Sequence, residues 1–128
     1  MPAKSHKVFV GDSKCSDAFM SKVKANQEIP ITPERAELIS EVICEHFSIM
    51  KPMIFFTGTY YPWRRGTYYH FHRRILLHKK GENLSTFLHE LAHHVQRNYL
   101  KDLGRRHHSD KFVIAFEKVV SLYENYLA

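Results

Sequence analysis

Three histidines and one glutamate lie within eleven consecutive residues, 86–96, of sequence TFLHELAHHVQ. His89 and His93 are four positions apart, so on a helix they lie one turn apart on one face, where two imidazole nitrogens can bind one zinc ion. Glu90 lies between them and points to one side, where it can take a proton from a zinc-activated water and later donate it to a leaving group. This H-E-x-x-H spacing predicts a zinc site with two histidine ligands and Glu90 as general base and acid.

The same segment has the apolar periodicity of a helix. Leucine, phenylalanine, alanine, valine and tyrosine side chains recur at three- and four-residue spacing from residue 84 to residue 103 and form one stripe. His89 and His93 lie on the far side of that stripe. An isolated pair of histidines at this spacing would usually be a solvated polar face, but Glu90 and the amphipathic helix favour the metal site. We expect Gly104 to end the helix.

A catalytic zinc ion has three protein ligands and one open position. An extended motif with glycine at 96 and a third histidine at 99 is excluded, because the chain has Gln96 and Tyr99. His94 points about 100° away from His93 and is expected at the surface or behind the ligands. The remaining candidates lie further along the chain: His107, His108 and Glu117.

The segments HELAHH and HHSDKFVIAFEK together resemble the SprT/Spartan-like and YgjP-like zinc metallopeptidases. In those families a downstream H-[G/S]-x-x-F element supplies the third zinc ligand, and the spacing from His108 to Phe112 matches it, whereas His107 is one residue too far. The resemblance covers roughly residues 66–116. It implies a zincin-like fold, a Zn²⁺ cofactor, His108 as third ligand and hydrolysis of peptide bonds in protein or peptide substrates. The ending HHVQ and the small size also resemble minimal gluzincins, which would make Glu117 the third ligand.

The rest of the chain must position this helix. Thr32 at an N-cap, with Pro33 following, predicts a helix that is ended by Pro52 and buries Ala36, Ile39, Val42, Ile43 and Phe47. β-Branched and aromatic residues predict strands over residues 53–61, 66–72 and 74–80, and apolar spacing predicts a last helix over residues 110–126. Shorter patterns suggest a strand at residues 7–10 and a helix at 16–26 capped by Ser16.

We therefore predict an α+β, small zincin-like domain with an N-terminal helix, a three-stranded twisted sheet, the HExxH helix and a C-terminal helix. Residues 66–80 also resemble the zincin edge strand, which binds an extended substrate by β-augmentation.

Length and composition fit one domain over residues 1–128, of which 1–30 could form an N-terminal extension or pro-segment. The two cysteines, Cys15 and Cys44, lack metal-binding or redox spacing. The chain has no signal-like start and no apolar run of about 18 residues. We expect a cytoplasmic monomer without membrane contact.

The net charge of +6 and the interleaved aromatics and arginines of residues 59–74 suggest a second kind of partner. Such a surface can bind DNA by stacking and charge, although a hairpin with buried aromatics and solvated arginines is the favoured interpretation.

A nucleic-acid-binding module with a structural zinc is one alternative function, with His107, His94 or an acid as fourth ligand. A latent or degenerate zincin whose cleft is filled by residues before Ile29 is another. In the catalytic case, Tyr99 or His107 would stabilise the oxyanion.

Overall fold

The computed structural model of the chain describes residues 15–128. Its elements are α2 (Asp17–Asn26), α3 (Pro33–Phe47), β1 (Met53–Phe56), β2 (Gly66–Tyr69), β3 (Arg74–Leu77), a 3₁₀ turn (Lys79–Gly81), α4 (Leu84–Asn98) and α5 (Asp110–Tyr126). These helices and the three-stranded mixed sheet confirm the predicted α+β class. The strand expected at residues 7–10 lies outside the described residues. None of the helices in the described part is long and apolar enough to cross a membrane.

Each of the four α-helices within residues 15–128 is preceded by a side chain that accepts a backbone N–H from three residues later. These N-caps are Ser16, Thr32, Asn83 and Ser109. Such caps satisfy N–H groups that have no partner within the helix. The predicted caps Ser16 and Thr32 are confirmed, and the start of α5 immediately after Ser109 fixes the position of the preceding residue, His108.

The helix ends differ from the sequence prediction. α3 ends at Phe47 because Ser48 adopts a left-handed conformation, four residues before Pro52. α4 ends at Asn98 rather than at residue 103, because Lys101 has a positive φ of 58° and the N–H of Asp102 turns back to the carbonyl of Gln96 (3.1 Å). The chain therefore leaves the helix early and forms a loop that runs back beside it.

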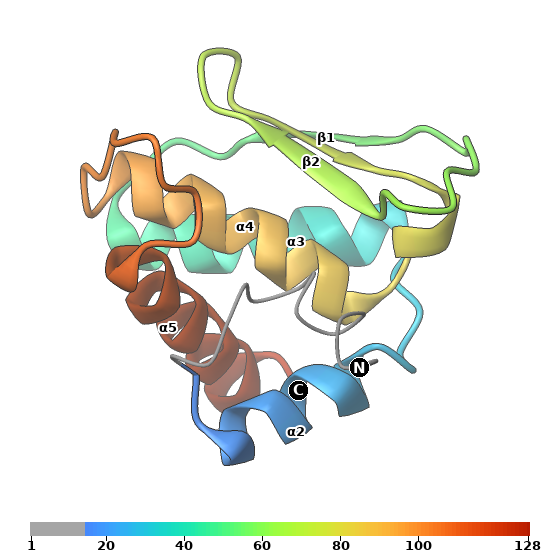
Figure 1. The fold of residues 1–128 in the computed structure, drawn as a ribbon, viewed down its shortest axis with the longest axis horizontal. Coiled ribbons are helices and arrows are strands. Elements are labelled where there is room, and N and C mark those ends of the chain that lie inside the picture. Colours follow the sequence, from blue (N-terminus) through green and yellow to red (C-terminus); the bar gives the residue numbers. More distant parts are fainter. Residues whose placement is uncertain (1–14) are drawn as a thin grey trace.

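The sheet has the order β1-β3-β2, with β3 parallel to β1 and antiparallel to β2. All three predicted strands are present, but each has only four residues. They are shorter than expected because Gly58 (φ 72°) turns the chain after β1 and Arg73 (φ 48°) turns it between β2 and β3. As Figure 1 shows, β2 is the edge strand that crosses over α4.

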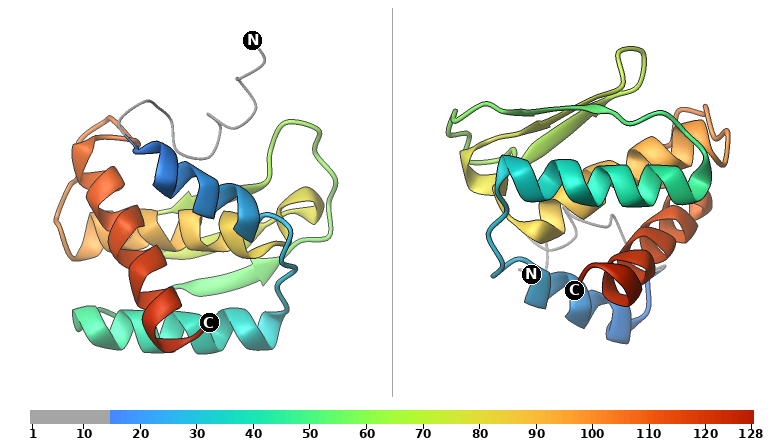
Figure 2. Two further views of the ribbon diagram at one scale, coloured as in Figure 1. Left: turned by 90° about the horizontal axis from the view of Figure 1, so that it is seen from below. Right: turned by 180° about the vertical axis from the view of Figure 1, so that it is seen from behind.

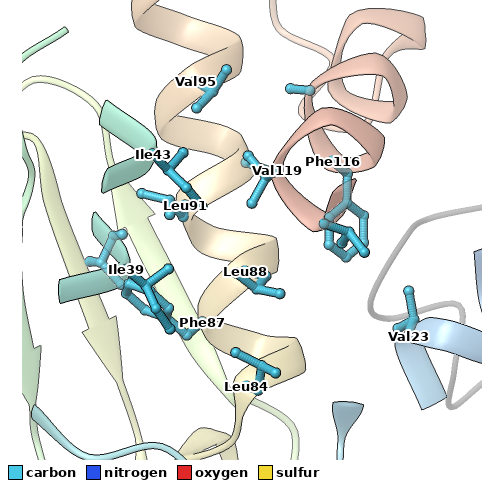
Figure 3. Packing of buried hydrophobic residues seen from close by; sticks show 14 of the residues in the cluster. Val23, Ile39, Ile43, Leu84, Phe87, Leu88, Leu91, Val95, Phe116 and Val119 are labelled. Atoms are coloured by element: carbon cyan, nitrogen blue, oxygen red, sulfur yellow. The ribbon is translucent and has the colours of Figure 1, made fainter. Parts of the chain in front are cut away.

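Helix α4 is the centre of the molecule. Figures 1 and 2 show the sheet on one side of it, α3 alongside, and α2 and α5 on the opposite side. Its apolar side chains pack against α3 through Ile39 and Ile43 and face Phe116 and Val119 of α5 (Figure 3). Its whole length from Leu84 to Arg97 is buried. The predicted apolar stripe is therefore present, but the opposite face is covered as well.

Helix α2 is part of this core. Phe19 and Val23 are buried, and the ring of Phe19 meets that of Phe116 edge-on at 5.1 Å. Lys22 forms an ion pair with Glu124 (3.1 Å) at the surface. Residues 17–26 thus contribute to the folded core and do not pack as a separate extension.

Replacing Phe19 with alanine should lower the free energy of unfolding by about 3–5 kcal/mol, because a large buried ring is lost and a cavity remains. Leu38→Ala on α3, where the side chain is 44% exposed, is the matched control and should change stability by less than about 1 kcal/mol. Urea unfolding followed by circular dichroism measures both. Equal stability of the two variants would show that α2 does not belong to the cooperative core.

Candidate metal centre

Three imidazoles converge at one end of the molecule. His89 and His93 of α4 and His108 before α5 each offer one ring nitrogen, and these nitrogens lie within 4.8 Å of one another. The rings of His93 and His108 are stacked at 5.1 Å, and the ring of His89 meets both edge-on, at 5.0 and 5.1 Å. The structure therefore brings together the three histidines that were predicted as ligands.

An aromatic side chain packs against all three histidines of this group. The ring of Phe112, in the first turn of α5, lies 4.4 Å from His93, 4.6 Å from His108 and 5.0 Å from His89. Phe112 is fully buried. The cap at Ser109 and the phenylalanine three residues later thus fix the loop histidine against the two helix histidines, which explains the H-S-x-x-F spacing in physical terms.

Gln96 orients His93. Its amide oxygen lies 2.9 Å from His93 Nδ1, while its amide nitrogen donates to Asp102 Oδ2 (2.9 Å) and to the carbonyl of His107 (3.0 Å). A carboxylate and a carbonyl can only accept, so the amide nitrogen must face them and the oxygen must face His93. His93 Nδ1 is then the donor, and its Nε2 keeps a lone pair. This is the usual role of a group that holds a metal-binding histidine from behind.

Asp102 links this amide to the last helix. Its Oδ2 also accepts from the hydroxyl of Ser109 (2.5 Å). The hydrogen bond from Ser109 holds the pKa of Asp102 below its ordinary value despite some burial, and the bonds from Gln96 and the Gly104 N–H act in the same direction. The carboxylate thus fixes the loop relative to the N-terminus of α5.

The donor set fits a divalent transition metal such as zinc. Burial lowers the pKa of His93 to about 3 and, together with the proximity of His93 and His108, lowers the pKa of His89 well below its ordinary value. These imidazoles are therefore neutral, as metal ligands must be. Three neutral imidazoles with an open fourth position are the ligands of one known type of catalytic zinc site.

Glu90 lies beside this group, and only 7% of it is exposed. Burial raises its pKa to about 8. A Cβ at Gly66 would lie 3.2 Å from Glu90 Cγ and 3.0 Å from the carbonyl of Leu76. Strand β2 can approach Glu90 this closely because residue 66 has no side chain.

Glu90 and the three histidines line one cleft of about 690 Å³. Its lining also includes residues 63–71, which contain β2, and four residues around the loop after α4: Leu103, Gly104, His107 and His108. None of residues 15–28 lines the cleft.

His94 is not a surface residue as one expectation had it, because it is fully buried. Its Nε2 lies 2.7 Å from the carbonyl of Met50, which can only accept, and its Nδ1 lies 2.8 Å from the hydroxyl of Tyr68 on β2. The ring thus joins α4 to the sheet and to the segment after α3. With both nitrogens engaged, His94 is unsuited to be a fourth metal ligand.

Glu117 and Tyr99 are not brought to the group. Glu117 is exposed and lines a separate hollow with His46 and Phe47. The ring of Tyr99 packs against Phe47 at 4.6 Å and is absent from the lining of the cleft. Between His108 and Glu117, only His108 is grouped with His89 and His93, and the structure gives Tyr99 no position from which to stabilise an oxyanion.

His107 lines the cleft but is not a member of the three-histidine group. Arg97 Nη2 lies 3.2 Å from His107 Nδ1. Because arginine can only donate, Nδ1 accepts and the ring proton is on Nε2, which leaves no lone pair for a metal. Arg97, Asp102 and the orienting role of Gln96 were not anticipated from the sequence. The only signal was that Gln96 and Arg97 follow His93 by three and four residues on the helix.

Comparison of the chain with protein-family models, with curated proteins and with solved structures gives no match.

His108→Ala should abolish stoichiometric zinc binding, because two histidines alone hold the ion far more weakly, whereas Glu117→Gln should bind zinc as the unchanged chain does. Competition with a chromophoric chelator measures both affinities. Loss of binding in Glu117→Gln together with retention in His108→Ala would reverse the assignment of the third ligand.

Proposed function

We propose that the protein is a zinc-dependent metallopeptidase. The observation that carries the proposal is the combination of three converging imidazoles with one buried carboxyl group in one cleft. A bound zinc ion would act as a Lewis acid that polarises the scissile carbonyl and makes water a stronger nucleophile. The described residues supply the remaining requirements, namely proton transfer and substrate alignment.

Glu90 is the proposed general base and acid. It follows His89 directly on α4 and lines the cleft, so it can reach a water that attacks from the metal side. In its ionised form, which burial disfavours, it takes one proton from that water while the water oxygen bonds to the carbonyl carbon. It then donates the proton to the leaving amine as the C–N bond breaks. No other carboxylate among the described residues lines the cleft.

The edge of β2 offers a place for an extended peptide. His78 N donates to the carbonyl of Arg65 (2.9 Å), so in this antiparallel pair the N–H and C=O groups of Gly66 and Tyr68 point away from β3. No strand of the described chain pairs with this edge. A substrate strand could bind these groups by β-augmentation and pass directly over Glu90. This supports the predicted substrate-binding role of residues 66–80, with β2 rather than β3 as the strand in contact.

The alternative with a structural zinc ion requires a fourth protein ligand. Of the two histidines considered for that position, His94 has both ring nitrogens in hydrogen bonds, with Met50 and Tyr68. The Nδ1 of His107 accepts from Arg97, which places the ring proton on Nε2 and leaves no lone pair for a metal. The hydrogen bonds of these two residues therefore favour an open, catalytic site.

Glu90→Gln should lower the hydrolysis of fluorescein-labelled casein by about 10²–10⁴-fold, because the proton acceptor is lost, and should leave zinc bound. His93→Ala should lose both zinc and hydrolysis. Fluorescence release measures the activity, and atomic absorption after dialysis measures the metal. Glu45→Gln on α3 is the control for the loss of one carboxylate. Full activity of Glu90→Gln would refute the proposed mechanism.

A second candidate partner is single-stranded DNA. Between Glu45 and Glu82 the chain has no acidic residue but seven basic ones: Lys51, Arg64, Arg65, Arg73, Arg74, Lys79 and Lys80. Trp63 and Phe71, both at the cleft, are 89% and 93% exposed, so these two aromatics are not buried as the favoured interpretation of the hairpin required. Exposed rings beside cations suit stacking with bases.

Replacing both Trp63 and Phe71 with alanine should weaken binding of a fluorescein-labelled 20-nucleotide oligothymidylate at least about tenfold, since each stacked base contributes roughly 1–3 kcal/mol. Fluorescence anisotropy at fixed salt measures the affinity, and Met50→Ala, which removes another exposed apolar side chain, is the control. Unchanged affinity of the double variant would exclude base stacking. Equal displacement of the oligonucleotide by polyglutamate would indicate a surface for acidic proteins instead.

A further inference from the structure

His107 is an imidazole that lies next to the three-histidine group without belonging to it. Its ring centroid is 6.3 Å from that of His93, and the two rings are nearly perpendicular, at 85°. It lines the same cleft as Glu90 and the residues of β2. A substrate carbonyl bound between β2 and the group would therefore lie within the space that this ring borders.

Arg97 determines which nitrogen of His107 carries the proton. Because the guanidinium group donates to Nδ1 (3.2 Å), the neutral ring has its N–H at Nε2. Arg97 is only 8% exposed, and its Nη1 donates to the carbonyls of Asp102 (2.6 Å) and Gly104 (2.9 Å). The guanidinium group is thus fixed by the loop backbone, and the His107 ring is held by a rigid partner.

The backbone of His107 is fixed by a second contact. Its carbonyl accepts from the amide nitrogen of Gln96 (3.0 Å), whose amide oxygen binds His93. Two residues of α4 therefore hold His107, one at the ring and one at the main chain. An exposed loop histidine without a role would have no need of two such contacts, and together they give its ring a defined position relative to His93.

We propose that His107 is a catalytic residue whose Nε2–H donates a hydrogen bond to the oxyanion formed during peptide hydrolysis, and that Arg97 is its positioning residue. The proposal rests on the proposed peptidase function. When the water oxygen bonds to the carbonyl carbon, the π electron pair of the carbonyl moves onto its oxygen and Glu90 takes the water's proton. As the carbonyl forms again, the C–N bond breaks and the amine takes that proton. The oxyanion between these two steps needs a fixed donor, and loss of one such donor lowers kcat by about 10²–10³-fold.

The tautomer can be tested without metal or substrate. In the full chain labelled with ¹⁵N-histidine, the ring nitrogen shifts of His107 should report an Nε2–H tautomer, with His107→Ala used to assign the signals. Arg97→Met should produce a mixture of tautomers, and Arg97→Lys, which still donates, should restore much of the original state. An Nδ1–H tautomer of His107 in the unchanged chain would overturn the proposal.

The oxyanion contact can be tested with two inhibitors of the zinc-loaded chain. A phosphinic analogue of Ala-Ala-Phe presents a tetrahedral anionic centre, whereas the corresponding mercaptoacyl dipeptide binds zinc through sulfur alone. His107→Ala should weaken binding of the phosphinic analogue about 100-fold and that of the thiol less than about threefold. His107→Gln, which keeps a donor, should recover part of the loss, and His72→Ala, which removes an imidazole outside the cleft, should change neither affinity.

Equal weakening of both inhibitors, or no weakening of either, would overturn the role of His107, as would the absence of any binding of the phosphinic analogue. These outcomes are distinct from failure of the peptidase proposal. If casein hydrolysis depends on Glu90 but the inhibitor pattern is absent, only the oxyanion assignment is wrong. If no hydrolysis occurs, the peptidase proposal fails, while the tautomer and inhibitor measurements still decide whether His107 is a positioned donor.

Discussion

The hydrogen bonds of the Gln96 side chain are the interaction on which the arrangement of the site depends. One amide group joins His93 on α4, the carboxylate of Asp102 and the backbone of His107 in the following loop. The loop carries His108, so the group that orients one histidine also helps to hold the segment that supplies another. Because Asp102 accepts from Ser109, the same network reaches the N-cap of α5. The position of the third imidazole therefore depends on polar contacts made by α4 as well as on the packing of Phe112.

Helix α4 forms the centre of the hydrophobic core and also carries the polar and ionisable side chains of the site, two roles that usually conflict. A helix buried on all sides would normally be apolar, yet here it contains histidines, a glutamate, a glutamine and an arginine below 9% exposure. His94 binds Met50 and Tyr68, Gln96 binds the loop, and Arg97 binds two carbonyls and His107. These three residues satisfy their polar groups within the protein, whereas the hydroxyls of Ser85 and Thr86 on the same helix are buried without a hydrogen bond to any described residue. Glu90 differs from these residues, because its carboxyl group faces the cleft and is not held, within residues 15–128, by a hydrogen bond of the kind that fixes His94, Gln96 and Arg97.

The sequence was sufficient to predict the elements and the principal residues of the site. Caps, apolar spacing and the H-E-x-x-H pattern are local signals, and the positions of His89, Glu90 and His93 on one helix follow from them directly. His108 came from a resemblance, and the structure brings it to the other two histidines. The environment of His94 and the end of α4 could not be predicted, because they depend on Tyr68, Met50 and a left-handed Lys101 that only the folded chain brings into play. The network around Gln96 and Arg97 is likewise tertiary, since its partners lie in a loop with no periodic pattern.

Two of the three imidazoles belong to α4 and the third precedes the N-cap of α5, and this has a thermodynamic consequence. A metal ion held by His89, His93 and His108 would cross-link α4 to the start of α5 and close the loop of residues 99–107. An unfolded chain has no such preformed set of ligands, so the free energy of metal binding would be added to the free energy of folding. The thermal midpoint of the protein would then rise with the free concentration of the ion. The loop of residues 99–107 contains His107 and the two carbonyls that bind Arg97. Metal binding would therefore also order this loop.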